Sequence, residues 1–379
     1  MHKVYNWQLN RTMEYKYPET RPDKQVTWLF DTNKCIACQT CTVACKNAWT
    51  AGKGQEAMFW NNVETKPWGF YPLGWDIRLL EKLGSQNWDR NKYLGKTIFE
   101  TAPYGEEMLG FMPDAEDYLH PNIGEDEVSS AINQGDYLKM VHQPWMFYLQ
   151  RICNHCTYPA CVAACPRKSI YKRKEDGIVL IDQARCRGYQ ECVRGCPYKK
   201  SFFRDYTGKS EKCISCYPTV EQGNQTQCVV NCIGKIRLFG FKNNWQNPRE
   251  DNPFDYLIYF KKIALPLYPQ FGLEPNVYYI PPINVPGQFN KQLFGPGAET
   301  AVQLYREAYK DKYLIAVLML MGCTDKIIHR FDVKGDIETG YAIGYDEKGA
   351  EIIRVPIKEP IIIRNKYDEQ KDVYRISVS

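Results

Sequence analysis

The chain has 379 residues, a net charge of +5 and enough apolar residues, 44%, to build a packed core. This length suits one large domain or two to three smaller ones. The mild charge excludes a typical nucleic-acid-binding protein, which would carry a basic stripe. No stretch reaches the length of a membrane span, and residues 1–25 lack the apolar segment of a signal peptide. We therefore expect a soluble protein, carried by a partner if it works outside the cytoplasm.

The cysteines are the most informative feature of the sequence. Fifteen of the sixteen fall into four tight groups, and Tyr189 stands where the third group would have its second cysteine. The groups are Cys35, Cys38, Cys41, Cys45; Cys153, Cys156, Cys161, Cys165; Cys186, Cys192, Cys196; and Cys213, Cys216, Cys228, Cys232. Three sites with four cysteines and one site with three account for all of them.

Disulfides, zinc sites and iron–sulfur clusters are the three interpretations of these groups. Disulfides fit badly, because the cysteines lie close together and an odd number is grouped. Zinc sites usually draw two CxxC pairs from separated segments, and only the fourth group resembles that pattern. The first group has the ferredoxin spacing C-x2-C-x2-C-x3-C, and the third has it apart from Tyr189, with Pro197 after Cys196. We therefore expect iron–sulfur clusters.

In chain order, the first half contains an arm, a cysteine group and a long insertion. Residues 1–25 are the N-terminal arm, and a strand at 26–30 with a turn at 31–33 leads into the first group. Residues 50–146 form an insertion rich in aromatic residues, including Trp60, Trp68 and Trp75, which we expect to cap the clusters and form an interface. Residues 153–197 are predicted to be a compact two-cluster unit, with a helix at 162–164 and a hairpin turning at Asp176-Gly177.

The second half continues to residue 242 and then becomes a C-terminal extension, 243–379, which we expect to wrap a partner subunit. Residues 243–300 indicate an extended segment, 299–321 a helix with a buried apolar run, and 327–364 strands turning at 334–335 and 348–349, before a charged tail. The predicted fold class is α+β: residues 26–49 and 147–242 form two ferredoxin-like two-cluster units.

The pairing of the groups follows from ferredoxins, in which the fourth cysteine of each run binds the other cluster. Applied here, this swap gives four ligand sets: Cys35, Cys38, Cys41, Cys232; Cys45, Cys213, Cys216, Cys228; Cys153, Cys156, Cys161, Cys196; and Cys165, Cys186, Cys192. The alternative is that each group closes on its own cluster. It also leaves one three-cysteine site, so the count does not distinguish the two pairings.

Tyr189 makes one cluster different from the others. A phenol keeps its proton up to about pH 10 and is a poor ligand beside thiolates. We therefore expect three 4Fe-4S clusters and one 3Fe-4S cluster, with the 3Fe-4S cluster at the highest potential because it lacks an anionic ligand. Two alternatives remain open: Cys323 supplies the missing ligand, or a fourth iron is bound by water or hydroxide. Cys323 follows an apolar helix and is otherwise a small buried residue.

Basic residues and a histidine lie near the cysteines. Between the third and fourth groups, a basic cluster either offsets buried negative clusters or forms a solvated loop; it contains Lys199, Lys200, Arg204, Lys209 and Lys212. His155 is expected beside a cluster or at the surface rather than as a ligand, because the cysteines already saturate its site. The sequence contains no pattern typical of a substrate-converting site.

The four-cluster pattern resembles the electron-transfer beta subunits of the molybdenum oxidoreductases related to dimethyl sulfoxide reductase. Residues 33–50, NKCIACQTCTVACKNAWT, and 186–201, CRGYQECVRGCPYKKS, are similar to nitrate reductase beta subunits and their exported relatives. Residues 4–16, VYNWQLNRTMEYK, and 60–73, WNNVETKPWGFYPL, are most similar to nitrite oxidoreductase beta subunits of the exported type. Relatives often have Trp at the position of Tyr189, so the phenol is a departure that bears on the potential.

The resemblance implies a path for electrons. The cluster of Cys35 would face a catalytic alpha subunit bearing molybdopterin, followed by the clusters of Cys45 and Cys153. The 3Fe-4S cluster of Cys165 would face a gamma subunit bearing haem b. Nitrite would be oxidised to nitrate on the alpha subunit, with nitrate, selenate, perchlorate or chlorate reductases and ethylbenzene dehydrogenase as alternatives. The resemblance also implies a periplasmic or equivalent lumenal location by export with the alpha subunit, or else the cytoplasmic face of the membrane. A stand-alone polyferredoxin and a zinc-bound scaffold are the alternatives from other classes.

Overall fold

A four-stranded sheet lies at the centre of the protein. The computed structural model describes residues 2–15, 21–67, 71–103, 106–119, 145–358, 366–368, 370 and 373–375. The strand order is β12-β3-β14-β13, built from β3 (Lys24–Asp31), β12 (Arg237–Asn243), β13 (Leu265–Pro266) and β14 (Val277–Ile280). β3 confirms the strand expected before the first cysteine group. Its apolar run is buried on both faces, as expected for a central strand.

The C-terminal half contributes directly to this sheet. β14 pairs parallel with β3, whereas β12 pairs antiparallel with it on the other side. Tyr268, Phe271 and Val277 belong to the same apolar core as Trp28. The boundary expected at 242/243 therefore divides strands that belong to one sheet. Part of the segment expected to wrap a surface lies inside the core, because its aromatic and β-branched side chains are buried there.

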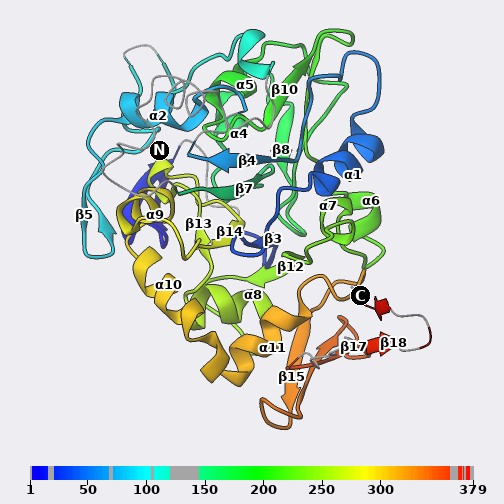
Figure 1. The fold of residues 1–379 in the computed structure, drawn as a ribbon. Helices are drawn as coiled ribbons and strands as arrows, with labels where there is room; N and C mark the ends of the chain where they lie inside the picture. Colours follow the sequence, from blue (N-terminus) through cyan, green and yellow to red (C-terminus); the bar gives the residue numbers. More distant parts are fainter. Residues whose placement is uncertain are drawn as a thin grey trace, which may run out of the picture.

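Short helices carry cysteines of all four groups, and two hairpins lie between the groups. The helices are α1 (Thr40–Trp49), α4 (Ala160–Ala164), α5 (Glu191–Gly195), α6 (Tyr217–Val220) and α7 (Gln227–Val230). The hairpins are β8 (Ile170–Lys172) with β9 (Val179–Ile181), and β10 (Ser201–Arg204) with β11 (Lys209–Lys212). α4 and the β8–β9 hairpin confirm the predicted helix and turn. Helix α1 packs against α7, and α4 against α5 (Figure 1).

The insertion is joined to the cysteine-bearing part by a strand pair. β4 (Asn62–Lys66) pairs antiparallel with β7 (Phe147–Arg151). The other elements are α2 (Trp75–Leu83), β5 (Trp88–Asp89), β6 (Lys92–Tyr93) and η1 (Glu116–Tyr118). A buried charge network lies between β4 and α2: Lys66 Nζ is 2.8 Å from Asp76 Oδ2 and 3.5 Å from Glu64 Oε2. Arg151 pairs with Glu64 as well. Trp68 lies outside the described residues.

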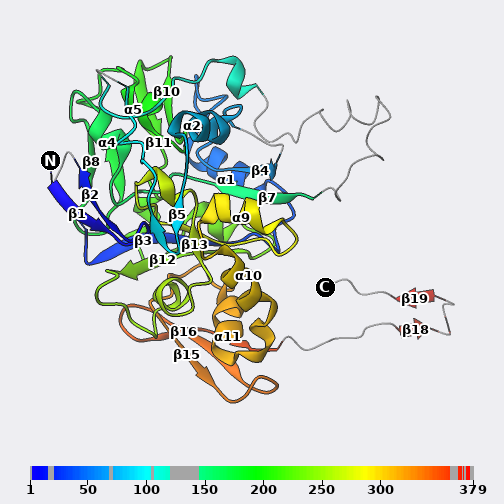
Figure 2. The same cartoon turned by 90° about the vertical axis from the view of Figure 1, so that its left-hand side faces the viewer.

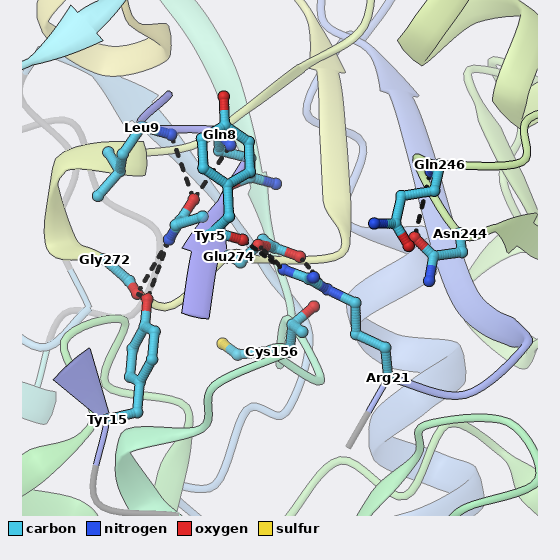
Figure 3. A network of polar contacts seen from close by, with 12 residues as sticks. Tyr5, Gln8, Leu9, Tyr15, Arg21, Cys156, Asn244, Gln246, Gly272 and Glu274 are labelled. Carbon is cyan, nitrogen blue, oxygen red and sulfur yellow. Dashed lines mark hydrogen bonds and ion pairs between the residues drawn. The ribbon is translucent and has the colours of Figure 1, made fainter. Parts of the chain in front are cut away.

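The N-terminal arm is a hairpin, β1 (His2–Asn6) with β2 (Arg11–Tyr15). Figure 3 shows how it contacts the loop that contains Gly272 and Glu274. The Tyr15 hydroxyl donates to Gly272 O at 2.6 Å, and Arg21 Nη2 lies 2.6 Å from Glu274 Oε2. Because Thr157 N donates in turn to Glu274 O at 3.0 Å, the arm also supports the second cysteine loop.

The C-terminal part forms a second apolar core below the sheet (Figures 1 and 2). The helices of the C-terminal part are α8 (Pro253–Asp255), η3 (Tyr256–Phe260), η4 (Pro269–Phe271), α9 (Gly287–Phe294), α10 (Ala298–Arg306), η5 (Ala308–Lys310) and α11 (Lys312–Leu320). Its other strands are β15 (Arg330–Lys334), β16 (Tyr341–Tyr345), β17 (Glu351–Pro356), β18 (Lys366–Asp368) and β19 (Val373–Arg375).

A single helix over residues 299–321 was a wrong prediction, whereas the expected strands are present. The helix is broken after Arg306, and Asp311 starts α11 by accepting from the backbone N–H groups of Tyr313 and Leu314. β15, β16 and β17 form an antiparallel sheet with the predicted turns; residues 359–365 lie outside the described residues. In the described parts of the chain, every helix is too short or too polar to cross a bilayer.

Candidate metal centres

Four cavities are lined by cysteines, and each gathers cysteines from two groups of the sequence. The first cavity is lined by Cys35, Cys38, Cys41, Cys232; the second by Cys45, Cys213, Cys216, Cys228; the third by Cys153, Cys156, Cys161, Cys196; and the fourth by Cys165, Cys186, Cys192. These are the sets that the ferredoxin swap brings together, and no cavity among these four is lined by one whole group.

The short helices link neighbouring cavities. Cys41 and Cys45 lie one turn apart on α1, and they line the first and second cavities. The same four-residue step separates Cys161 from Cys165, Cys192 from Cys196, and Cys228 from Cys232, each pair shared between two cavities. Residues four apart lie on the same side of a helix. On α1 the helix geometry therefore places Cys41 and Cys45 side by side and gives one to each cavity, whereas in the other pairs the second cysteine lies just past the helix end.

Tyr189 occupies the backbone position that corresponds to Cys38. Gln39 follows Cys38 and precedes α1 with φ 59° and ψ 3°, and Gln190 follows Tyr189 and precedes α5 with the same angles. This left-handed conformation is uncommon for a residue with a side chain, so its recurrence marks the two loops as equivalent. Tyr189 lines the fourth cavity and is 60% exposed. The fourth cavity therefore has a phenol at its solvent side where the first has the exposed thiol of Cys38.

Cys323, the sixteenth cysteine, follows α11 and is half-buried. Its thiol donates to Met319 O at 2.9 Å. It is not among the residues that line any of the four cavities.

Buried polar atoms around the cavities test whether a cluster fits. His155 Nε2 and Ser201 Oγ belong to residues that line the third cavity, and Trp60 Nε1 and Ser215 Oγ to residues that line the second. None of the four atoms has a hydrogen-bond partner among the described residues. Buried donors normally have partners, and the sulfides of an iron–sulfur cluster are acceptors. These residues therefore fit such a cluster.

A single metal ion fits less well. No three His, Cys, Asp or Glu side chains in the described ranges are arranged to hold one ion. A zinc site brings its sulfurs to about 2.3 Å from one point, and the described cysteines do not converge in that way. Burial raises the pKa of the Cys156, Cys161 and Cys213 thiols. Because metal ligands are thiolates, loading these sites would release protons.

His155 lies in the wall of the third cavity and not at the surface. It is fully buried and stacks on Trp28, with ring centroids 5.4 Å apart. Its Nδ1 accepts from Val179 N at 3.0 Å, which assigns the ring proton to Nε2. His155 is thus a neutral hydrogen-bond donor beside the cysteines, and burial lowers its pKa well below the usual value.

The basic cluster divides into buried and half-buried members. Arg204 and Lys209 are half-buried, whereas Lys199, Lys200 and Lys212 are buried. Lys212 lines the third cavity and donates to Cys213 O at 2.8 Å, and Cys213 lines the second. Burial lowers the pKa of Lys212, but the charges of Cys153 and Cys161 outweigh burial and raise it. Because Lys199, Lys200 and Lys212 are buried, the solvated-loop interpretation is wrong for these three residues.

Arg237 is the main residue that sequence reasoning missed. It is buried at the start of β12, lines the first cavity, and its Nη2 donates to Cys41 Sγ at 3.0 Å. The sequence did contain a signal for this role: a cation stands at the start of an apolar strand, shortly after Cys232. A buried charge needs a partner, and the nearby cysteines could provide it.

Comparisons with known proteins agree with this site. Residues 144–242 match a family model described as a 4Fe-4S dicluster domain. The chain is 41% identical over 306 residues to the selenate reductase subunit beta of Thauera selenatis, covering 74% of this chain and 89% of that protein. It is 41% identical over 310 residues to the chlorate reductase subunit beta of Ideonella dechloratans, with the same coverage. It is 45% identical over 280 residues to the respiratory nitrate reductase subunit beta of Haloferax mediterranei, covering 70% and 76%.

Proposed function

Because this chain belongs to the family of iron–sulfur beta subunits of molybdenum oxidoreductases, we propose that it carries electrons through four clusters between a catalytic molybdopterin alpha subunit and a haem b gamma subunit. The observation that carries the proposal is the set of four cysteine-lined cavities, linked in pairs by short helices. Iron–sulfur clusters supply one-electron transfer at each cavity.

The first, second and third cavities hold 4Fe-4S clusters in this proposal, and the fourth holds a 3Fe-4S cluster. The first three each have four cysteines, whereas the fourth has Cys165, Cys186 and Cys192 with Tyr189 beside them. The wall residues hold their sites by specific contacts: Trp49 Nε1 donates to Cys216 Sγ at 3.2 Å, and Ser169 N donates to Cys165 Sγ at 3.3 Å. Together, the cavities at 26–49 and 147–242 form two ferredoxin-like units.

The two ends of this path are the proposed contact sites for partners. Near the first cavity, Ile36, Val43 and Ile233 are exposed apolar side chains, which suits the alpha subunit. At the fourth cavity, Tyr189 and the nearby Tyr171 are exposed, which suits the gamma subunit. The expected roles of 50–146 as a cap and interface, and of the C-terminal extension as a wrap around a partner, belong to the same proposal.

Nitrite oxidation to nitrate is the proposed reaction of the complex. On the alpha subunit, nitrite would gain an oxygen from water and release two protons and two electrons, which this chain would pass on one at a time. The similarity of residues 4–16 and 60–73 to nitrite oxidoreductase beta subunits supports it. The relatives named for selenate, chlorate and nitrate support the runner-up, a reductase with electrons moving in the opposite direction.

We also propose a periplasmic or equivalent lumenal location, reached by export together with the alpha subunit. Protease accessibility in intact cells tests this: the protein should be protected until the outer compartment is opened, and protection that persists until the cytoplasm is released contradicts it.

Purification of the native protein tests the proposed function. We expect it to co-purify with molybdenum and haem, and to show the electron paramagnetic resonance (EPR) signal of an oxidised 3Fe-4S cluster in air. A brown protein that elutes alone and without molybdenum would instead support the polyferredoxin alternative. A colourless protein containing zinc would contradict both. Nitrite-dependent reduction of the clusters distinguishes nitrite oxidation from the reductase alternatives.

A further inference from the structure

Arg237 is a buried cation at the boundary between the first and second cavities. Its side chain lines the first cavity, where Nη2 donates to Cys41 Sγ at 3.0 Å. Its Nη1 donates at 2.7 Å to Oδ1 of Asn61, which lines the second cavity. The Phe30 ring lies 4.5 Å from the guanidinium carbon and helps to fix its plane. One side chain therefore contacts the walls of both cavities.

The charges around Arg237 come from the cysteines of these two cavities. Burial lowers the pKa of Arg237, but the neighbouring cysteines together, Cys41 and then Cys228 most strongly, raise it above its usual value. Conversely, burial raises the pKa of the Cys228 thiol, and Arg237 is the strongest influence against that rise. Cys41 lines the first cavity and Cys228 the second. Burying an arginine is costly without nearby negative charge, and here that charge comes from both sites.

We propose that Arg237 is a positioning residue for electron transfer, a single cation shared by the clusters of the first and second cavities that raises the reduction potential of both. This rests on the proposed function, because it requires a cluster in each cavity. Reduction adds one negative charge to a cluster, and a fixed cation between two clusters stabilises that charge on either one. The effective dielectric constant is low in the interior, so the effect exceeds that of a surface charge.

The shared cation also affects electron transfer between the clusters of the first and second cavities. In that step one electron leaves one cluster and reduces the next, and no proton or ligand moves. An electron on one cluster disfavours reduction of its neighbour by Coulomb repulsion. A fixed guanidinium leaves this repulsion itself unchanged, but its attraction favours the electron on either cluster, and it stays protonated at any physiological pH.

EPR-monitored redox titration of the purified complex tests the proposal, with the wild type, Arg237→Gln, Arg237→Lys and a control. The control is Lys242→Met, which removes another buried cation from the same strand. Lys242 donates to the Tyr259 hydroxyl at 3.2 Å, and its acidic neighbours are Glu274 and Asp255. Iron content and far-ultraviolet circular dichroism are measured for each variant.

In Arg237→Gln, two 4Fe-4S midpoint potentials should shift to more negative values, while the 3Fe-4S midpoint stays unchanged. Arg237→Lys keeps the charge, so its midpoint potentials should stay close to those of the wild type. Lys242→Met should have the wild-type midpoint potentials. Loss of iron from two clusters in Arg237→Gln but not in Arg237→Lys also supports the proposal. Wild-type midpoints in Arg237→Gln, equal shifts in both variants, or equal loss of all iron in both would overturn it. A wild-type complex without clusters would instead reject the proposed function.

Discussion

Cys41 and Cys45 lie one turn apart on α1, yet they line different cavities. Four residues of an α-helix advance about 6 Å along its axis. The same step recurs at the three other shared pairs of cysteines. On α1 the helix backbone thus helps to set the separation of the first and second sites, whereas Cys165, Cys196 and Cys232 lie just past the ends of their short helices.

Tyr189 should determine the iron content of the fourth site. Tyr189→Cys places a thiol at the backbone position that corresponds to Cys38, so we expect an additional iron to bind and the 3Fe-4S signal to disappear from the EPR spectrum in air. Tyr189→Phe is the control, because it removes only the hydroxyl and should keep the signal. An undiminished 3Fe-4S signal in Tyr189→Cys would show that the position does not face the cluster.

Trp49 should raise the reduction potential of the second site. Its indole N–H donates to Cys216 Sγ at 3.2 Å, and a hydrogen bond to a ligand sulfur stabilises the reduced cluster. Trp49→Phe keeps an aromatic side chain but removes the indole N–H that donates to Cys216. A net hydrogen bond of about 0.5–1.5 kcal/mol corresponds to a fall of roughly 20–65 mV for one electron. Potentiometric titration measures the fall, and a midpoint equal to that of the wild type would contradict this role.

Lys66 should stabilise the fold through the buried network with Asp76 and Glu64. Lys66→Met leaves buried carboxylates without this partner, which costs about 3–5 kcal/mol. Lys24→Met is the matched control: Lys24 pairs with Glu347 at the surface, and such pairs contribute about 0–1 kcal/mol. Urea denaturation measures both, and equal midpoints for the two variants would contradict the assigned difference.

The destabilisation by Lys66→Met should also depend on pH. Burial raises the pKa of Asp76, but Lys66, with smaller influences from Tyr268 and Arg151, outweighs burial, so the pKa lies below its usual value. In the wild type, the ionised Asp76 carboxylate therefore stabilises the fold fully above about pH 4, and this stabilisation is lost as the pH falls through the pKa of the folded state. In Lys66→Met, the Lys66 charge no longer opposes the effect of burial on the pKa of Asp76. Protonation of Asp76 in acid then removes the cost of burying its unpaired charge. The difference in unfolding free energy should be largest at neutral pH and shrink in acid; a difference that grows in acid contradicts this.

The elements around the cysteines could be predicted because their signals are local. The second cysteine group indicated a loop followed by a helix at 162–164, and Asp176-Gly177 indicated a hairpin; both are present. The equivalence of Tyr189 and Cys38 was also readable from spacing, and the matching angles of Gln190 and Gln39 agree with it.

Other features depend on contacts between distant segments, which spacing does not reveal. β14 joins β3 across about 250 residues of chain, and the contact of Arg237 with Cys41 spans a separation of 196 residues. The break before Asp311 was missed because residues 306–312, REAYKDK, contain no Pro or Gly that would mark a helix end, while the capping carboxylate starts a new helix. The burial of His155, which lies in a loop, follows from packing against Trp28 on β3.

The most direct test of the central claim compares Cys165→Ala with Cys196→Ala by EPR of the air-oxidised protein. Cys165 lines the fourth cavity with Cys186 and Cys192, whereas Cys196 lines the third with Cys153. We predict that Cys165→Ala loses the wild-type 3Fe-4S signal and that Cys196→Ala keeps it at the same midpoint potential. The reverse result would contradict the account, because it would mean that each cysteine group closes on its own cluster.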